Sequence, residues 1–183
     1  MALAEINPAP HFWGRAMGWC CMALADTLDF IPPEHSEKAE TLKAIARRLF
    51  TPLLKYQDGD TGLWFQVLDR GSTPGNYTES SASSMFIYFL LKMARLKTAS
   101  DGDAASIKTA AEKAYQGLLK NKILEDPSGE LHLTGICKVA GLGGEPYRDG
   151  SYEYYVNEPQ VADDFKGIGP FILASMEYGG ISG

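Results

Sequence analysis

An alternation of two kinds of helix constrains the fold of this chain more than any other feature. Residues 79–96 are apolar on almost every side, whereas residues 36–57 and about 103–120 are charged on one face and apolar on the other. A helix that is apolar all round is buried, and an amphipathic helix covers a core. The pattern therefore predicts an all-α protein in which inner helices alternate with outer ones.

A weak internal repeat indicates how these helices connect. Loops rich in glycine and aromatic residues precede Arg15, Glu79 and Phe165, at intervals of about 65 to 85 residues. Each loop leads into an inner helix, and the first two inner helices are followed by an outer one. Such hairpins close into an α/α toroid, with the loops lining one mouth. The chain holds two full hairpins and one extra helix, which is about half of a closed six-hairpin ring.

The first inner helix is predicted at about 15–28, and Pro32-Pro33 ends it. Its two faces differ at 100° per residue. The apolar stripe consists of Met17, Cys21, Leu24 and Leu28. The opposite side carries Arg15, Trp19, Met22 and Asp26. We therefore expect this helix to be covered on one side and to face a cleft on the other.

Local signals place the remaining elements. Ser36 begins the second helix, in which Pro52 is expected to cause a kink or an early end. Thr78 is the predicted cap of the third helix, and residues 131–139 alternate enough for a short strand pair. The last helix is predicted near 164–178, with Asp163 or Asp164 as its cap.

Composition limits the partners and the location. The 17 Lys+Arg against 23 Asp+Glu give a net charge of −6, which argues against nucleic acid or anionic membrane. An anionic substrate is still permitted where a few cations gather in one cleft. The three cysteines have no CxxC spacing, and the histidines match no metal spacing, so we expect neither a metal nor a cofactor. No apolar run approaches a membrane span, and the start resembles no signal peptide, so the expected location is the cytoplasm.

The string HFWGRAMGW carries the sharpest chemical signal. Trp13, Arg15 and Trp19 lie at a helix N-terminus, with Arg15 and Trp19 one turn apart. A guanidinium can hold a carboxylate by two parallel hydrogen bonds, and an indole offers a face for stacking a sugar. The alternative is an arginine paired with a structural acid such as Asp26 and a tryptophan in the core.

Four strings in order resemble glycoside hydrolase family 105, the unsaturated rhamnogalacturonyl hydrolases, and the related family 88 unsaturated glucuronyl hydrolases. They are FWGRAMGW, TGLWFQVLD, YTESSASSMFIYFLLK and the segment from AGLGGEPYRDGSYEYY to the last helix. The resemblance implies an (α/α)6 barrel. It also implies hydrolysis of the bond between a terminal Δ4,5-unsaturated galacturonic acid and rhamnose in pectin fragments. Arg15 and Trp19 match the arginine and the second tryptophan of the family signature W-x-R-x-x-G-W, which line the substrate pocket in that family. Trp13 matches the leading tryptophan of the same signature.

The resemblance also bears on catalysis. The family uses an aspartic acid to protonate the enol-ether double bond, which differs from the two-carboxylate scheme of most glycosidases. That aspartate and a histidine motif precede the arginine signature in the family, so the catalytic residue is unknown here. We expect residues 1–183 to be the C-terminal portion of one hydrolase domain that self-associates or packs with its N-terminal half. The alternatives are a non-catalytic remnant that binds acidic sugars and an unrelated α/α toroid such as a cyclase.

Further candidates lie in the loops. Trp64 is a possible contact at the mouth, with loop packing an equal alternative. Tyr147 and Arg148 match a loop that faces the mouth in the family, although Asp-Gly turn chemistry explains much of that string. Glu79, at a helix start, is expected to be a partner of the helix dipole rather than a catalyst.

Overall fold

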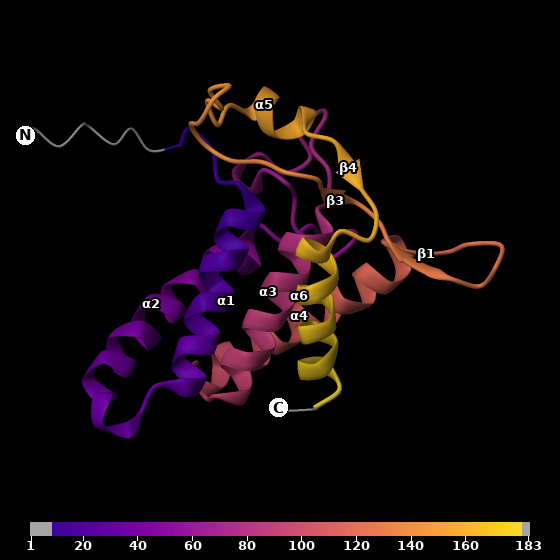
Figure 1. Cartoon of the computed structure of the whole chain (residues 1–183). Coiled ribbons are helices and arrows are strands. Elements are labelled where there is room, and N and C mark those ends of the chain that lie inside the picture. The colour runs from indigo at the N-terminus through magenta and orange to yellow at the C-terminus, as the bar shows by residue number, and fades with distance from the viewer. Residues whose placement is uncertain (1–8, 181–183) are drawn as a thin grey trace, which may run out of the picture.

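The computed structural model describes residues 9–180, and it is built mainly of helices (Figure 1). The helices are α1 (Gly14–Phe30), α2 (Ser36–Lys55), α3 (Ser80–Arg95), α4 (Asp101–Asn121), α5 (Tyr152–Asn157) and α6 (Phe165–Tyr178). Single turns of 3-10 helix lie at Pro33–His35 and Leu68–Arg70. The strands are β1 (Ile123–Glu125), β2 (Leu131–Leu133), β3 (Ile136–Cys137) and β4 (Gln160–Val161). None of the helices in this range is long and apolar enough to cross a membrane.

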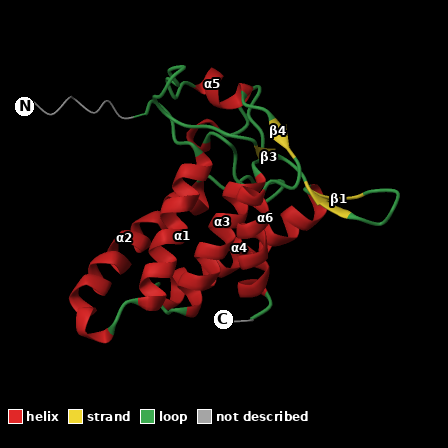
Figure 2. Cartoon of the chain, in the orientation of Figure 1, coloured by secondary structure: helices red, strands yellow, loops and turns green. Residues whose placement is uncertain are grey.

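Helix α3 lies at the centre of the arrangement. It packs against α1, α4 and α6, while α2 lies outside and contacts α1 and α4. The α1–α2 and α3–α4 hairpins and the extra α6 therefore match the predicted alternation of inner and outer helices. Loops and α5 gather at the end where α1, α3 and α6 begin (Figure 2).

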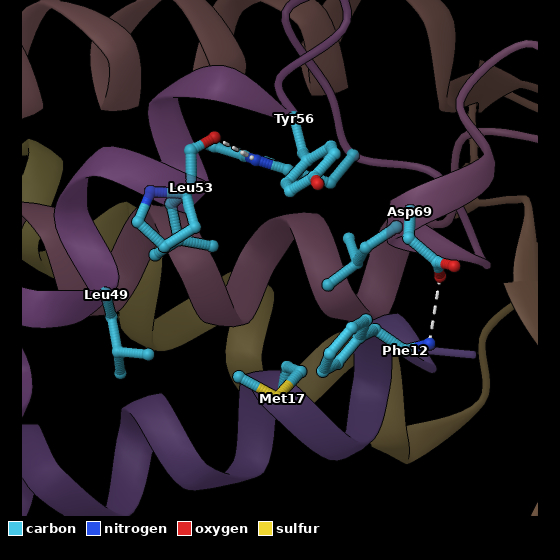
Figure 3. A pocket seen from close by; sticks show the side chains of 9 residues that line it. Phe12, Met17, Leu49, Leu53, Tyr56 and Asp69 are labelled. Atoms are coloured by element: carbon cyan, nitrogen blue, oxygen red, sulfur yellow. Dashed lines mark hydrogen bonds between the residues drawn. The ribbon is translucent and has the colours of Figure 1, made fainter. Parts of the chain in front are cut away.

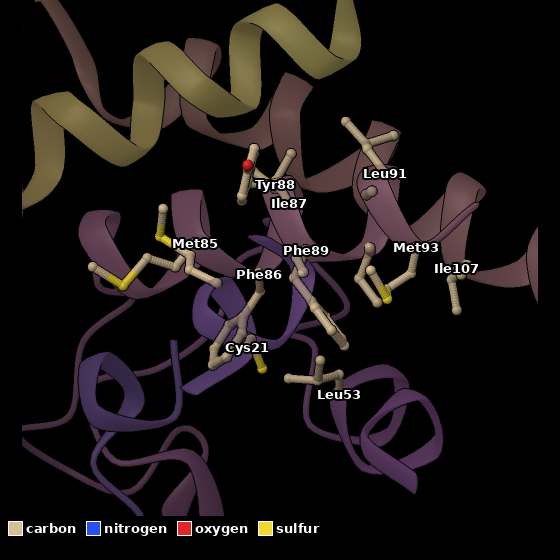
Figure 4. Packing of buried hydrophobic residues seen from close by; sticks show 14 of the residues in the cluster. Cys21, Leu53, Met85, Phe86, Ile87, Tyr88, Phe89, Leu91, Met93 and Ile107 are labelled. Atoms are coloured by element: carbon tan, nitrogen blue, oxygen red, sulfur yellow. The ribbon is translucent and has the colours of Figure 1, made fainter. Parts of the chain in front are cut away.

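The sequence of α3 explains its central place. The helix is buried continuously from Ser80 to Met93. Figure 4 shows Phe86, Phe89 and Met93 packed toward side chains of other helices, among them Leu53 and Ile107. The predicted interior position is confirmed. Neighbouring helices cover residues 80–93.

Two glycines bring α1 against α3. A methyl group at Gly14 would lie 3.1 Å from Cβ of Ala82, and one at Gly18 would lie 2.9 Å from Cβ of Met85. Arg15, on the side of α1 that was predicted to face a cleft, is consequently buried against α3, whereas Trp19 on the same side is exposed.

The opposite ends of α1, α3 and α6 are joined by charged side chains. Lys92, only 4% exposed, has its Nζ 2.8 Å from Asp26 and 3.2 Å from Asp29. Arg95 reaches Asp29 at 3.2 Å and Glu177 at 2.9 Å. These pairs link the last turn of α3 to both of its inner neighbours, and we call them the far-end cluster.

Several local predictions need correction. Helix α2 continues through Pro52 to Lys55, so the proline does not end it early. The cap of α3 is Glu79, whose carboxylate accepts a hydrogen bond from the Ala82 amide at 2.6 Å, and not Thr78. Asp164 caps α6 as expected.

The strands also pair differently from the prediction. Residues 131–139 do not form one strand pair, because β2 pairs with β1 and β3 pairs with β4. The partner strands lie outside the alternating segment on either side. Helix α5 was not predicted at all, since six residues are too few to show a helical period.

Candidate functional site

A buried ionic network lies where α1 and α3 begin. The guanidinium of Arg15 donates from Nε to Ser81 Oγ at 2.7 Å and from Nη2 to Glu79 Oε1 at 3.3 Å. Nη2 also donates to the backbone oxygen of Cys137 in β3. The network therefore joins residues of α1, α3 and β3 that are far apart in the sequence.

Glu79 is the acceptor at the centre of this network. Its side chain is fully buried, and its carboxylate receives the Cys137 amide at 2.9 Å, the Ala82 amide at 2.6 Å and the Ser81 hydroxyl at 2.8 Å. Burying a carboxylate is costly unless it is paired and hydrogen-bonded. Here the backbone donors of α3 and β3 and the charge of Arg15 supply that compensation.

Polar side chains beside the network enclose the Cys137 thiol. Burial raises the pKa of Cys137 and the pKa of Tyr77, so both are protonated at neutral pH. The side chains of Gln66 and Tyr77 lie by this thiol, and Gln66 Oε1 and the Tyr77 hydroxyl have no hydrogen-bond partner among residues 9–180. The thiol is thus an interior group without nucleophilic character.

Trp13 covers the network from the loop side. Its ring stacks on Tyr155 with centroids 6.0 Å apart and planes 19° apart, and Arg15 Cζ lies 5.9 Å from its centroid. The Trp13 ring therefore belongs to the same group of side chains as Arg15, as the signature string led us to expect.

Arg15 and Trp19 differ sharply in exposure. Arg15 is 1% exposed and paired with Glu79, whereas Trp19 is 46% exposed. The two side chains, which we expected to share an open pocket because of their common helix face, therefore lie in different settings. The acid that pairs with Arg15 is also not Asp26, which binds Lys92 at the far end.

The loop candidates occupy three different settings. Trp64 is fully buried, and its indole N–H donates to the Leu53 carbonyl at 2.8 Å. Arg148 donates from Nε to the Gly143 carbonyl at 2.9 Å, within its own loop. Tyr147 is 75% exposed and borders an open polar hollow of about 460 Å³. Of these three, Tyr147 alone presents a free ring face.

An apolar cavity of about 250 Å³ lies between α1, α2 and the loop before α3. Phe12, Met17, Leu49 and Leu53 surround it in Figure 3. Asp69 is turned to the backbone amide of Phe12, with 2.9 Å between oxygen and nitrogen. A sugar needs polar partners for its hydroxyl groups, so this cavity is a poor candidate for a sugar site.

The hairpin of β1 and β2 brings together residues that the sequence did not connect. Ligand atoms of Asp126, Glu130 and His132 lie within 4.8 Å of one another. Hydrogen bonds from Ser128 and Glu130 lower the pKa of Asp126 to about 2, and the His132 ring bonds to Asp163 at 2.6 Å. The turn itself therefore explains how these groups are arranged.

None of the shifted carboxyl groups in the described ranges suits a proton donor. Carboxyls with a clearly shifted pKa are all shifted downward: Asp29, Glu40, Asp69, Asp126, Asp149, Asp163 and Asp164. A general acid at neutral pH needs a raised pKa. We therefore assign none of these seven carboxyls as a proton donor.

Comparison with known proteins identifies the family of this chain. Residues 1–180 match the model of Glycosyl Hydrolase Family 88. The chain belongs to this family. A family 105 glycoside hydrolase from C. acetobutylicum ATCC 824 superimposes with a TM-score of 0.89 and 48% identity, over 98% of this chain and 48% of that one. The predicted family and the (α/α)6 barrel fold are thereby confirmed, and the chain spans about half the length of that structure.

Two curated relatives add to this. Protein Atu3128 of Agrobacterium fabrum is 45% identical over 177 residues, which is 93% of this chain and 75% of the relative. The unsaturated rhamnogalacturonyl hydrolase YesR of Bacillus subtilis is 32% identical over 87 residues, which is 48% of this chain and 24% of the relative. An unrelated toroid such as a cyclase is excluded by these matches.

Proposed function

We propose that this chain binds a terminal unsaturated uronic acid and forms part of a hydrolase that releases it from rhamnose in pectin fragments. The observation that carries the proposal is the buried network of Arg15, Glu79 and Ser81. It joins the arginine of FWGRAMGW to the start of the TESSASS helix, 64 residues away, at the loop end of the inner helices. The name of YesR supports the choice of rhamnogalacturonan fragments.

The proposed contacts divide by chemistry. Arg15 supplies positive charge for the uronate carboxylate. Trp13, Trp19 and Tyr147 supply ring faces for the sugar rings. Trp64 and Arg148 act through position, because Trp64 holds the loop before α3 against α2 and Arg148 holds the Gly143 turn.

Hydrolysis of these substrates starts with protonation of an enol ether, by the family resemblance. The clearly shifted carboxyl pKa values of the described residues are all lowered, so we assign none of these carboxyls as the proton donor. The second candidate function is sugar binding without turnover, which the same observation favours.

One experiment separates the two. Purified chain is titrated with an unsaturated galacturonosyl-rhamnose disaccharide by calorimetry, and loss of the enol-ether absorbance is followed in parallel. The same disaccharide saturated at C4–C5 is the control. Binding with turnover supports the hydrolase, and binding without turnover supports the second candidate. No binding at all would refute both.

A further inference from the structure

We propose that Glu79 is a positioning residue that sets how strongly Arg15 holds a carboxylate. This inference rests on the proposed function, since it concerns the affinity of the same site for its anionic sugar. Glu79 would act as an internal counter-ion that orients the guanidinium while partly neutralising it.

The orientation is fixed from several sides. Both Glu79 oxygens are held by donors from α3 and β3, so the carboxylate has no freedom to rotate away. Arg15 in turn uses Nε on Ser81 and Nη2 on Glu79 and the Cys137 carbonyl. Packing and hydrogen bonds of this kind lock a side chain in one geometry.

One edge of the guanidinium is left over. The hydrogen bonds of Arg15 within residues 9–180 come from Nε and Nη2 and leave Nη1 unused, and the side chain is 2% exposed. An incoming carboxylate would therefore meet the Nη1 edge, and not the two-pronged face that the isolated arginine suggests. Other cations at this end are engaged, since Lys166 Nζ lies 2.7 Å from Asp164 and Arg148 binds Gly143.

The charges of Arg15 and Glu79 predict that neutralising Glu79 makes the site bind an anionic ligand more tightly. A ligand carboxylate at Nη1 is attracted by Arg15 and repelled by Glu79 on the other side of the same guanidinium. Glu79→Gln keeps the size of the side chain and removes the repulsion. At the effective dielectric of a protein interior, this should tighten binding on the order of tenfold. The same substitution leaves a buried cation uncompensated and places an amide against the Ala82 donor, so stability should fall.

The test compares Glu79→Gln with wild type in calorimetric titrations with the unsaturated disaccharide, together with thermal unfolding. Glu177→Gln is the matched control, because Glu177 is a mostly buried partner of Arg95 in the far-end cluster. It should lower stability and leave affinity unchanged. Lower stability together with tighter binding in Glu79→Gln supports the proposal, because loss of a purely structural residue would lower both the stability and the affinity for the disaccharide.

The remaining outcomes are also decisive. If wild type binds the disaccharide and Glu79→Gln binds it with equal or lower affinity, the role of Glu79 is overturned and the proposed function stands. Binding by Glu79→Gln alone supports the role of Glu79 and refutes uronate binding by the wild type. Binding by neither protein overturns both proposals.

Discussion

Replacing Gly18 by alanine tests the close approach of α1 and α3. The added methyl carbon would lie 2.6 Å from Sδ and 2.9 Å from Cβ of Met85, which is fully buried. The thioether can swing aside, but Cβ moves only with the backbone of α3. Overpacking of this kind costs about 1–3 kcal/mol, and the higher helix propensity of alanine offsets up to about 1 kcal/mol of it.

The expected net loss is therefore up to about 2 kcal/mol, or a fall in Tm of up to about 8 °C for a chain of this size. Thermal unfolding followed by circular dichroism measures it. Gly102→Ala in α4 is the matched control, because nothing lies within 4 Å of the position of its new methyl group. That variant should be as stable as wild type or more so. Equal gains in Tm for both variants would refute the argument that Gly18 is required by helix contact.

Two further changes test the electrostatics. Arg15→Ala leaves the Glu79 carboxylate buried without its cation and should lower the free energy of unfolding in urea by about 3–5 kcal/mol. Lys43→Ala is the control, because it removes only an exposed pair with Glu40 and should have no measurable effect. Similar losses for the two variants would contradict the reasoning. His132→Asn tests the surface pair with Asp163, where the partners' hydrogen bond raises the pKa of His132 and lowers that of Asp163. Its contribution is fully present between the ordinary values of 3.8 and 6.5, is lost as pH rises through the raised pKa of His132, and is lost as pH falls through the lowered pKa of Asp163. A Tm difference between wild type and variant that stays constant from pH about 4 to about 9 would show that the pair does not titrate as described.

The helices were predictable because their signals are local. The continuous apolar character of residues 79–96 identifies an interior helix without knowledge of its neighbours, and the structure confirms it. The proline pair after residue 31 and the acidic cap at Asp164 also act within one turn. Such features depend on the chain alone and are visible in it.

The partner of Arg15 was not predictable in the same way. Asp26 is close in sequence and on the same helix face, so it was the natural structural acid to consider. The actual partner, Glu79, follows a loop and an entire outer helix, and only the packing of α1 on α3 brings it near. Strand β3 is similar, because its pairing with β4 depends on the path of residues 138–159. The roles of the proposed sugar contacts remain predictions for the experiments above.

The far-end cluster has a mechanical consequence. Lys92 and Arg95 join the last turn of α3 to α1 and α6, and the Arg15–Glu79 network joins α1 and α3 again at their first turns. Helices α1 and α3 are thus fastened at both ends and cannot slide along one another without breaking several ionic contacts at once, whereas α6 is fastened at its last turn alone. If Tyr147 contacts the sugar as proposed, adaptation to ligands of different shape would come from the loop of residues 138–151, which carries this exposed side chain. Selection for a new sugar would alter the length and composition of that loop while leaving the inner helices unchanged.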